Sequence, residues 1–437
     1  MTAPRMPGLN IDEELKNKLL FTALAIFIYR VGAHIVSPTV DVAALQAYLQ
    51  TSTTSGTLFQ LYDALGGGLS RATILALGIM PYISASIVFQ LAAGVVPTVS
   101  KMQKDEEGRK KITQWTRYLT VLISLSQAYT FALFVEGLGA VPNPGFVSRM
   151  LMVVILTTGA IFVMWLGEQI TERGIGNGMS LLITVSILER LWPGTFHMIG
   201  FVRDGVMSFP AAVLFLAVLV GMITAVVAMT LAARKIPIQI PRKVMGRGRV
   251  REGQKTFIPV RLITAGVMPI IFAQTVIIVP STLASFTQNG ILREVANFMV
   301  PGSTAYNVLF ALLIVVFSYF YTSIIFNSVD LSENLKKQGG FIPGVKPGAA
   351  TADYIDQVLA RVTLPGAIFL AAISIIPILI GKQVGYQSTF GGTSVLIVVG
   401  VLLDTIAQIE QHRTLRKYDS FMKTGRVKFR GRQQRFI

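Results

Sequence analysis

The chain has 437 residues, of which 52% are hydrophobic and 14% charged, and its 39 Lys and Arg residues exceed 22 Asp and Glu residues for a formal net charge of +17. Soluble domains carry about 25% charged residues, and apolar runs near the roughly 18-residue membrane threshold recur throughout, so the composition predicts a polytopic membrane protein and not a soluble domain. The chain has no cysteine, which excludes disulfides, thiolate metal sites and thiol nucleophiles, and its three His residues are scattered. We therefore expect neither a metal site nor a cofactor.

Breaks at Pro, Gly and charged residues divide the apolar sequence into ten predicted membrane-spanning helices. Mixed charges precede the first run, which has no compact cleavage site, so we expect a retained span rather than a signal peptide. The fifth run gives the weakest prediction, because it is short and ends at Glu189 and Arg190. In chain order the predicted spans are 19–36, 72–96, 118–138, 147–167, 176–192, 211–233, 262–285, 305–327, 361–380 and 393–409.

The distribution of Lys and Arg indicates the orientation of these spans, because cytoplasmic loops collect basic residues. If both termini are cytoplasmic, the cytoplasmic segments contain 32 of the 39 basic residues and the external loops contain 5. This asymmetry favours an all-α protein of ten transmembrane helices with both ends inside. The predicted organisation is an N-terminal half at 1–192, an external hinge loop at 193–210, a C-terminal half at 211–409 and a basic cytoplasmic tail at 410–437.

The segment TLFQLYDALGGGLSRA follows the first span, at 57–72, and is too short to cross a membrane. Its apolar side chains fall on one helical stripe, and three glycines follow them. The pattern predicts a half-helix on a hinge, at about 57–70, that re-enters the membrane as a stopper; a plain interfacial helix is the alternative. The stripe and the hinge consist of Leu58, Phe59, Leu61, Tyr62, Leu65, Gly66, Gly67 and Gly68.

A short repeat links the second and seventh spans. GIMPYISAS at 78–86 and GVMPIIFAQ at 266–274 share glycine, methionine, proline, isoleucine and alanine at equivalent positions. The two spans are five apart, so the halves enter the bilayer in opposite directions, and Gly/Pro-interrupted helices in inverted halves usually flank the functional pathway. These spans carry aliphatic residues that indicate either ordinary packing or an apolar constriction closed by dewetting: Ile79, Ile83 and Ile271.

Several functional classes compete for a pathway between the halves. A coupled transporter needs ionisable groups at mid-membrane, and Arg30 and Asp404 are the nearest candidates. A primary pump needs a nucleotide-binding loop, and the stretch GRVREGQKT has Gln254 where the loop lysine would stand. The leading hypothesis is a passive polypeptide channel driven by a partner. A secondary transporter with inverted repeats and an insertase that never opens a full pore are the alternatives.

The stretch PRKVMGRGRVREGQK, at 241–255, is the most basic part of a long loop at 234–261. Orientation of the spans and attraction to anionic lipid explain some of this charge. For the basic tail, they are as good an explanation as a docking partner. Spaced arginines between glycines, however, suit bidentate phosphate contacts. We therefore expect a large anionic partner to dock on this loop.

These features together resemble the SecY family, the central channel-forming subunits of the protein translocation machinery, over essentially the whole chain. The resemblance implies two five-helix halves arranged as a clamshell, with a lateral gate between spans two and three on one side and seven and eight on the other. The stretches that carry it are GGGLSRATILALGIMPYISASIVFQL (66–91), DEEGRKKITQWTRY (105–118), MWLGEQITERGIGNGMSLLI (164–183), AGVMPIIFAQ (265–274), FIPGVKPGAATADYID (341–356) and FGGTSVLIVVGVLLD (390–404).

The resemblance also assigns roles to residues. It implies that the half-helix, Leu58 to Leu69, is a plug that closes the resting channel. The constriction ring implied by the family consists of Ile79, Ile83, Ile183, Ile271, Thr275 and Ile397. The implied polar residues of the lateral gate are Ser84, Ser86, Gln127 and Gln274.

The resemblance implies a channel that is not an enzyme and that lies in the bacterial cytoplasmic membrane. The implied partners are the small subunits SecE and SecG, the motor ATPase SecA, the ribosome, signal peptides with their preproteins, and anionic lipids. Lys346 departs from the family pattern, which commonly has arginine there, so the bidentate fork is lost. The implied docking residues, in the basic segments 234–261 and 328–361, are Arg242, Lys243, Arg247, Arg249, Arg251, Lys336, Lys337 and Lys346.

Overall fold

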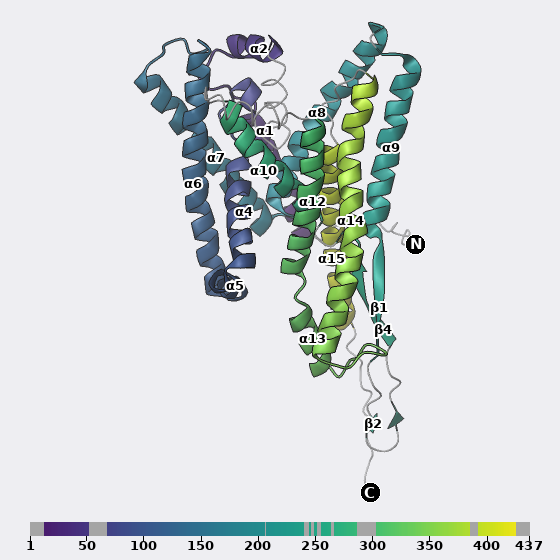
Figure 1. The fold of residues 1–437 in the computed structure, drawn as a ribbon. Coiled ribbons are helices and arrows are strands. Elements are labelled where there is room, and N and C mark those ends of the chain that lie inside the picture. The colour runs from purple at the N-terminus through teal and green to yellow at the C-terminus, as the bar shows by residue number, and fades with distance from the viewer. Residues whose placement is uncertain are drawn as a thin grey trace, which may run out of the picture.

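The structure is a computed structural model, and its described residues form a long bundle of α-helices with a β-hairpin beyond one end (Figure 1). We call that end, where α5 (Pro97–Lys104) and α13 (Ser328–Lys337) also lie, the hairpin end, and the opposite end the α2 end, after α2 (Val42–Thr51). The structure describes residues 13–51, 68–205, 207–239, 244–245, 249–250, 255–263, 266–285, 303–384 and 392–424.

Each of the ten predicted spans overlaps one long helix of the described residues. Six apolar helical segments are long enough to cross a membrane, and α4 with α5 adds a seventh, bent by 107°. The apolar parts of α8 and α10 are shorter, and α1 begins with charged residues. The ten helices are α1 (Glu13–Gly32), α4 (Met80–Val95), α6 (Glu106–Gly137), α7 (Phe146–Arg173), α8 (Gly178–Arg203), α9 (Phe209–Leu231), α10 (Met268–Ser285), α12 (Thr304–Ile325), α14 (Ala349–Val384) and α15 (Gly392–Thr424).

One continuous apolar core joins the two halves of the chain. α4 packs against α6 in its own half and against α10 across the middle, while α10 packs against α12 and α15 packs against α8. The most apolar stretches of α7 and α15 are 56% buried, compared with 22% for α9. α7 and α15 are therefore central helices, and α9 turns most of its surface outward to where lipid would lie.

The nine-residue repeat of the second and seventh spans is also a repeat in backbone conformation. Gly78 and Gly266 both have positive φ, 54° and 60°, in the region that favours glycine. The amide of each donates to the carbonyl three residues earlier, over 2.8 Å for Gly78 and 3.3 Å for Gly266. α4 and α10 begin two residues after these glycines, each with proline in its first turn. Ile83 and Ile271 consequently occupy equivalent positions in the two halves.

The predicted hinge loop at 193–210 is mostly helical, which corrects the sequence analysis. α8 continues to Arg203, and α9 begins at Phe209. Pro193 lies inside α8, where it removes one backbone hydrogen bond without ending the helix, as membrane helices tolerate.

Two basic segments predicted as a loop and a tail are also partly helical. The segment 328–361 contains α13 and the first turns of α14, and α15 continues past 410 to Thr424. The Asn327 side chain caps α13 by accepting from the Asp330 amide, and Lys336 and Lys337 occupy its last turn. A polar N-cap and C-terminal cations are signals for a short helix that hydropathy alone does not detect.

The basic loop 234–261 is a β-hairpin rather than an irregular loop. β1 (Ala233–Gln239) pairs antiparallel with β4 (Lys255–Arg261), and the short strands β2 (Val244–Met245) and β3 (Arg249–Val250) pair beyond them. Alternate residues of β1 point inward, and Ile236 and Val260 pack with Ile342, Ile355 and Leu359. The base of the hairpin is therefore fixed to α14 and the segment before it.

Candidate functional site

The six residues of the implied constriction ring come from four regions of the chain and are all buried. Ile79 directly precedes α4, and the others lie on α4, α8, α10 and α15. The five isoleucines belong to the single apolar core between the halves. The hydroxyl of Thr275 donates to the Ile271 carbonyl over 2.8 Å, so it offers no free donor to a passing ion. The structure thus buries five isoleucines and one internally bonded threonine in the core between the two halves.

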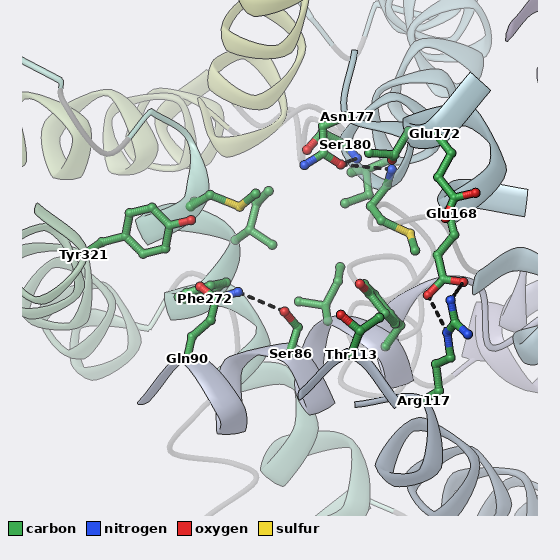
Figure 2. A pocket seen from close by; sticks show the side chains of 17 residues that line it. Ser86, Gln90, Thr113, Arg117, Glu168, Glu172, Asn177, Ser180, Phe272 and Tyr321 are labelled. Carbon is green, nitrogen blue, oxygen red and sulfur yellow. Dashed lines mark hydrogen bonds and ion pairs between the residues drawn. The ribbon is translucent and has the colours of Figure 1, made fainter. Parts of the chain in front are cut away.

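A cavity of about 390 Å³ lies between the two halves, with lining residues from α4, α6, α7, α8, α10 and α12 (Figure 2). Three ring residues, Ile83, Ile183 and Ile271, form part of its lining. Side chains of α10 and α12 add an apolar wall that includes Phe272 and Tyr321. The facing side is polar, with side chains from α6, α7 and the start of α8. Because isoleucines of the implied constriction ring form part of its lining, we call this cavity the funnel.

Two of the predicted gate residues lie on α4, one on α10 and one on α6. Ser84 donates to the Met80 carbonyl over 3.0 Å, and Ser86 accepts from Gln90 over 2.8 Å, so both serines bond within α4. Gln274 of α10 is 3% exposed, and its side-chain carbonyl has no hydrogen-bond partner among the described residues. Gln127 of α6 is half-buried. None of these interactions joins α4 to α10 by a hydrogen bond.

Most of the predicted plug, Leu58 to Gly67, lies outside the described residues. Its last two residues are described. Gly68 donates its amide to the Ala76 carbonyl over 3.0 Å, and the Leu69 side chain is buried in the apolar core. The end of the plug segment is therefore attached to the turns that precede α4.

The predicted docking residues divide between described and undescribed parts of the hairpin end. Arg249 lies on β3, and Lys336 and Lys337 are exposed at the end of α13. The backbone carbonyl of Lys346 accepts from the Thr351 hydroxyl over 2.9 Å, just before α14 begins. The remaining four predicted docking residues, Arg242, Lys243, Arg247 and Arg251, lie outside the described residues.

A cluster of charges around Glu189 was not predicted. Arg30 of α1 forms an ion pair with Glu189 of α8 and also donates to the Val185 carbonyl over 2.5 Å. Arg71 and His34 approach the same carboxylate at 3.2 and 3.3 Å. The sequence did contain a signal for this cluster, namely isolated charged residues in otherwise apolar spans, because a charge within the membrane needs a partner of opposite sign. Arg30, a candidate coupling residue for a transporter, is thus engaged by Glu189.

Two contacts across the hairpin-end mouth of the gate were also missed. Gly94 of α4 lies against the ring of Phe320 in α12, where an added Cβ would be 2.7 Å from a ring carbon. Lys104 of α5 and Asp330 of α13 form an ion pair of 3.2 Å. We call this ion pair the mouth clasp, because it joins the elements that follow the two gate helices α4 and α12.

Comparisons with known proteins identify the family and the fold. The family model described as SecY matches residues 73–406. The chain is 40% identical to "Protein translocase subunit SecY" of Escherichia coli (strain K12), over 98% of this chain and 100% of that protein, and 40% identical to the Aquifex aeolicus (strain VF5) protein of the same name, over 94% and 97%. A solved structure titled "The structure of a protein conducting channel" has a TM-score of 0.66 at 15% identity, covering 98% of both chains. A second, titled "Sec61 in the Canine ribosome-channel complex from the endoplasmic reticulum", has a TM-score of 0.63 at 16% identity, also covering 98% of both chains.

The structural likeness extends over nearly the whole chain and establishes the fold, while the family is established by sequence. The predicted ten-helix membrane fold is confirmed. With a family model over most of its length and relatives at 40% identity over almost all of it, the chain belongs to the SecY family.

Proposed function

We propose that the protein is a passive protein-conducting channel. It translocates signal-bearing polypeptides across the bacterial cytoplasmic membrane and releases apolar segments sideways into lipid between α4 and α10. The observation that supports this most directly is a cavity between the two halves whose lining includes three buried isoleucines of the implied ring, Ile83, Ile183 and Ile271. A constriction of five isoleucines, with its one threonine hydroxyl bonded to its own helix, is poorly suited to replace the hydration shell of an ion, so it stays dry when closed.

The energy for transport comes from a partner that docks on the hairpin end. The hairpin base is anchored by Ile236 and Val260 to the region of α14, which supports a stable attachment of this basic segment to the hairpin end of the bundle. We propose that SecA or a ribosome binds there, and that Lys336, Lys337 and Lys346 add to the same surface. The chain itself then needs no catalytic centre.

The distribution of basic residues supports a cytoplasmic position for the hairpin end and for both termini. Small membrane subunits of the SecE and SecG kind would cover part of the outward-facing helix surfaces, and anionic lipid would neutralise the basic tail. The mostly exposed surface of α9 supports contact with either lipid or such a subunit.

Reconstitution into lipid vesicles tests the proposed function. Vesicles containing the protein with its SecE-type and SecG-type subunits should import a signal-bearing preprotein only when SecA and ATP are present. A preprotein without its signal segment should stay outside. Uptake of a small solute that saturates and responds to substitution of Asp404 would instead indicate a transporter. Membrane insertion without any export of soluble preproteins would indicate an insertase.

A further inference from the structure

The polar wall of the funnel contains two carboxylates, one of which is neutralised. Glu168 of α7 pairs with Arg117 of α6 through two bonds, Nε to Oε1 and Nη2 to Oε2, both 2.9 Å. Figure 2 shows this pair on the cavity wall. A bidentate arginine pair of this kind fixes both side chains and cancels the two charges. It leaves Glu168 little capacity to bind anything else.

Glu172 lies one helical turn beyond Glu168 on the same wall (Figure 2). No cation among the described residues lies within ion-pairing distance of Glu172, although Arg117 interacts with it at longer range. A carboxylate in a last helical turn opposes the helix dipole. The chain therefore keeps a carboxylate where helix energetics disfavour one.

Glu172 is exposed, so water solvates its carboxylate, and no neighbouring group of the described residues binds it. The first amides of α8, which would attract an anion, are already occupied because the Asn177 side chain accepts from Met179 and Ser180 at 3.1 and 3.3 Å. The Thr171 hydroxyl accepts from the Gly178 amide over 2.9 Å. Glu172 is thus the one carboxylate among the described lining residues that no cation neutralises directly.

The opposite wall of the funnel has the complementary property, because it is mainly apolar, with the Tyr321 hydroxyl as a polar group on it (Figure 2). Met268 and Phe272 of α10 and Tyr321 of α12 form this wall. Phe272 and Tyr321 pack edge to face, with centroids 5.6 Å apart. One cavity thus presents an apolar surface beside the gate and a negative charge across from it. A signal segment has the matching pattern, an apolar run of roughly 7–15 residues preceded by a positively charged region.

We propose that Glu172 binds the basic N-terminal flank of a signal segment while the apolar wall of the funnel receives the hydrophobic run. The inference rests on the proposed channel function and adds a residue that determines specificity. Holding the basic flank at the funnel entrance keeps it on the side from which the preprotein arrives, so the hydrophobic run enters the gate as a loop. Segments with a neutral or acidic flank lose this contact and engage more slowly.

Translocation of three matched preproteins tests this proposal. They differ only in the charge of the signal flank, which is basic, neutral or acidic, and each is imported by SecA and ATP into vesicles containing the full complex. The wild-type protein should prefer the basic flank to the acidic one. Glu172→Gln should reduce that preference by about two- to fivefold, the size expected for one partly solvated ion pair, and Glu172→Lys should favour the acidic flank. Glu107→Lys, an exposed charge in the first turn of α6 that does not line the funnel, should leave the preference unchanged.

The ratio of rates distinguishes this proposal from other outcomes. If Glu172→Lys and Glu172→Gln slow all three preproteins by the same factor, Glu172 affects folding or partner docking and the proposal is wrong. If the ratio stays at its wild-type value in both variants, the flank is bound elsewhere and the proposal is also wrong. Failure of the wild-type complex to import any preprotein would instead contradict the channel function itself.

A proximity measurement gives a second readout that does not depend on rate. Thr113→Cys places a thiol in the funnel lining while Glu172 stays intact, and the chain has no other cysteine. A preprotein with one cysteine in its basic flank should form a disulfide with this position under mild oxidation. Adding Glu172→Lys should lower the yield about two- to fivefold. An unchanged yield would overturn the assignment of Glu172.

Discussion

Gly159 of α7 lies directly against the backbone of Ile74, in the turns before α4, so that a Cβ atom on Gly159 would be 1.9 Å from the Ile74 carbonyl oxygen. Gly366 of α14 makes the same approach to Leu262, where the distance would be 2.4 Å. Ile74 and Leu262 each stand four residues before the positive-φ glycine of their repeat. The inverted halves therefore share a packing contact as well as a turn.

Alanine at either glycine should destabilise the fold, because the obstructing atom is backbone and cannot rotate away. Overpacking of this kind costs about 1–3 kcal/mol. We expect Gly159→Ala and Gly366→Ala to lower the unfolding temperature in detergent. Gly221→Ala is the control, since a Cβ there meets no other atom within 4 Å, and it should be neutral or slightly stabilising. Equal unfolding temperatures for the three variants would contradict the close approach.

The aliphatic ring should control the resting conductance. Ile83→Ser combined with Ile271→Ser places hydroxyls at equivalent positions of both repeats, so water enters the constriction and ion current in planar bilayers should rise. Preprotein translocation should persist, because the ring only has to open. Val276→Ser, on an outward-facing position of α10, should leave the current unchanged.

Deletion of residues 58–69 provides a second test of the seal. Without the plug, the ring is the remaining closure, and brief, flickering openings should appear. If the double serine variant with the plug also deleted conducts no more than the wild type, then the isoleucines are packing residues and the pathway lies elsewhere.

Several features of the fold could be predicted because each depends on local sequence. Lipid requires about 20 apolar residues for each span, and the Gly-x-Met-Pro repeat indicates the same interrupted helix at Gly78 and Gly266. Two of the three aliphatic residues that this repeat indicates, Ile83 and Ile271, line the funnel together. The repeat alone thus identifies Ile83 and Ile271, 188 positions apart in the chain, as equivalent residues of the two halves.

Other features could not be predicted, because they depend on contacts between distant segments. Nothing local shows that Arg30 and Glu189, 159 residues apart, meet at one end of the bundle. α8 continues through Pro193 against the usual effect of proline. The alternation of Ile236 and Ile238 indicated a β-strand, but the high positive charge of the segment favoured the prediction of a loop.

Removal of the Glu189 carboxylate should destabilise the α2 end of the protein. Glu189→Gln leaves Arg30, Arg71 and His34 close together without their shared anion. The side chain of Glu189 is 27% exposed, so we expect a loss of about 1–3 kcal/mol, between the values for exposed and buried pairs. Glu136→Gln, which removes the anion of a one-to-one pair with Arg149, should cost less. Chemical denaturation of the purified complex measures both, and an equal loss would show that the cluster does not act as a unit.

Charge reversal in the hairpin should weaken partner binding. We expect Arg249→Glu with Arg251→Glu to lower the affinity for SecA or ribosomes, and each lost phosphate contact should reduce the salt slope by about 1 if the partner is RNA. Folding should be unaffected, since the hairpin base is held by apolar packing. Lys346→Arg should bind as well as the wild type or better, because it regains a bidentate fork. If the double variant binds both partners as well as the wild type at physiological salt, these arginines only help to orient the chain in the membrane.

The mouth clasp should bias the gate toward its closed form. Lys104 and Asp330 are both more than half exposed, so their attraction is worth at most about 1 kcal/mol and is screened by salt. Lys104→Glu replaces this attraction by repulsion and should separate α5 from α13, while the double reversal with Asp330→Lys should restore the wild-type distance. Spin labels on cysteines introduced at Lys101 and Val329 report that distance. Lys337→Glu, which breaks an exposed pair within α13 alone, should not change it. A distance distribution that is the same in all four proteins at low salt would show that the apolar contact of Gly94 with Phe320 holds the mouth by itself.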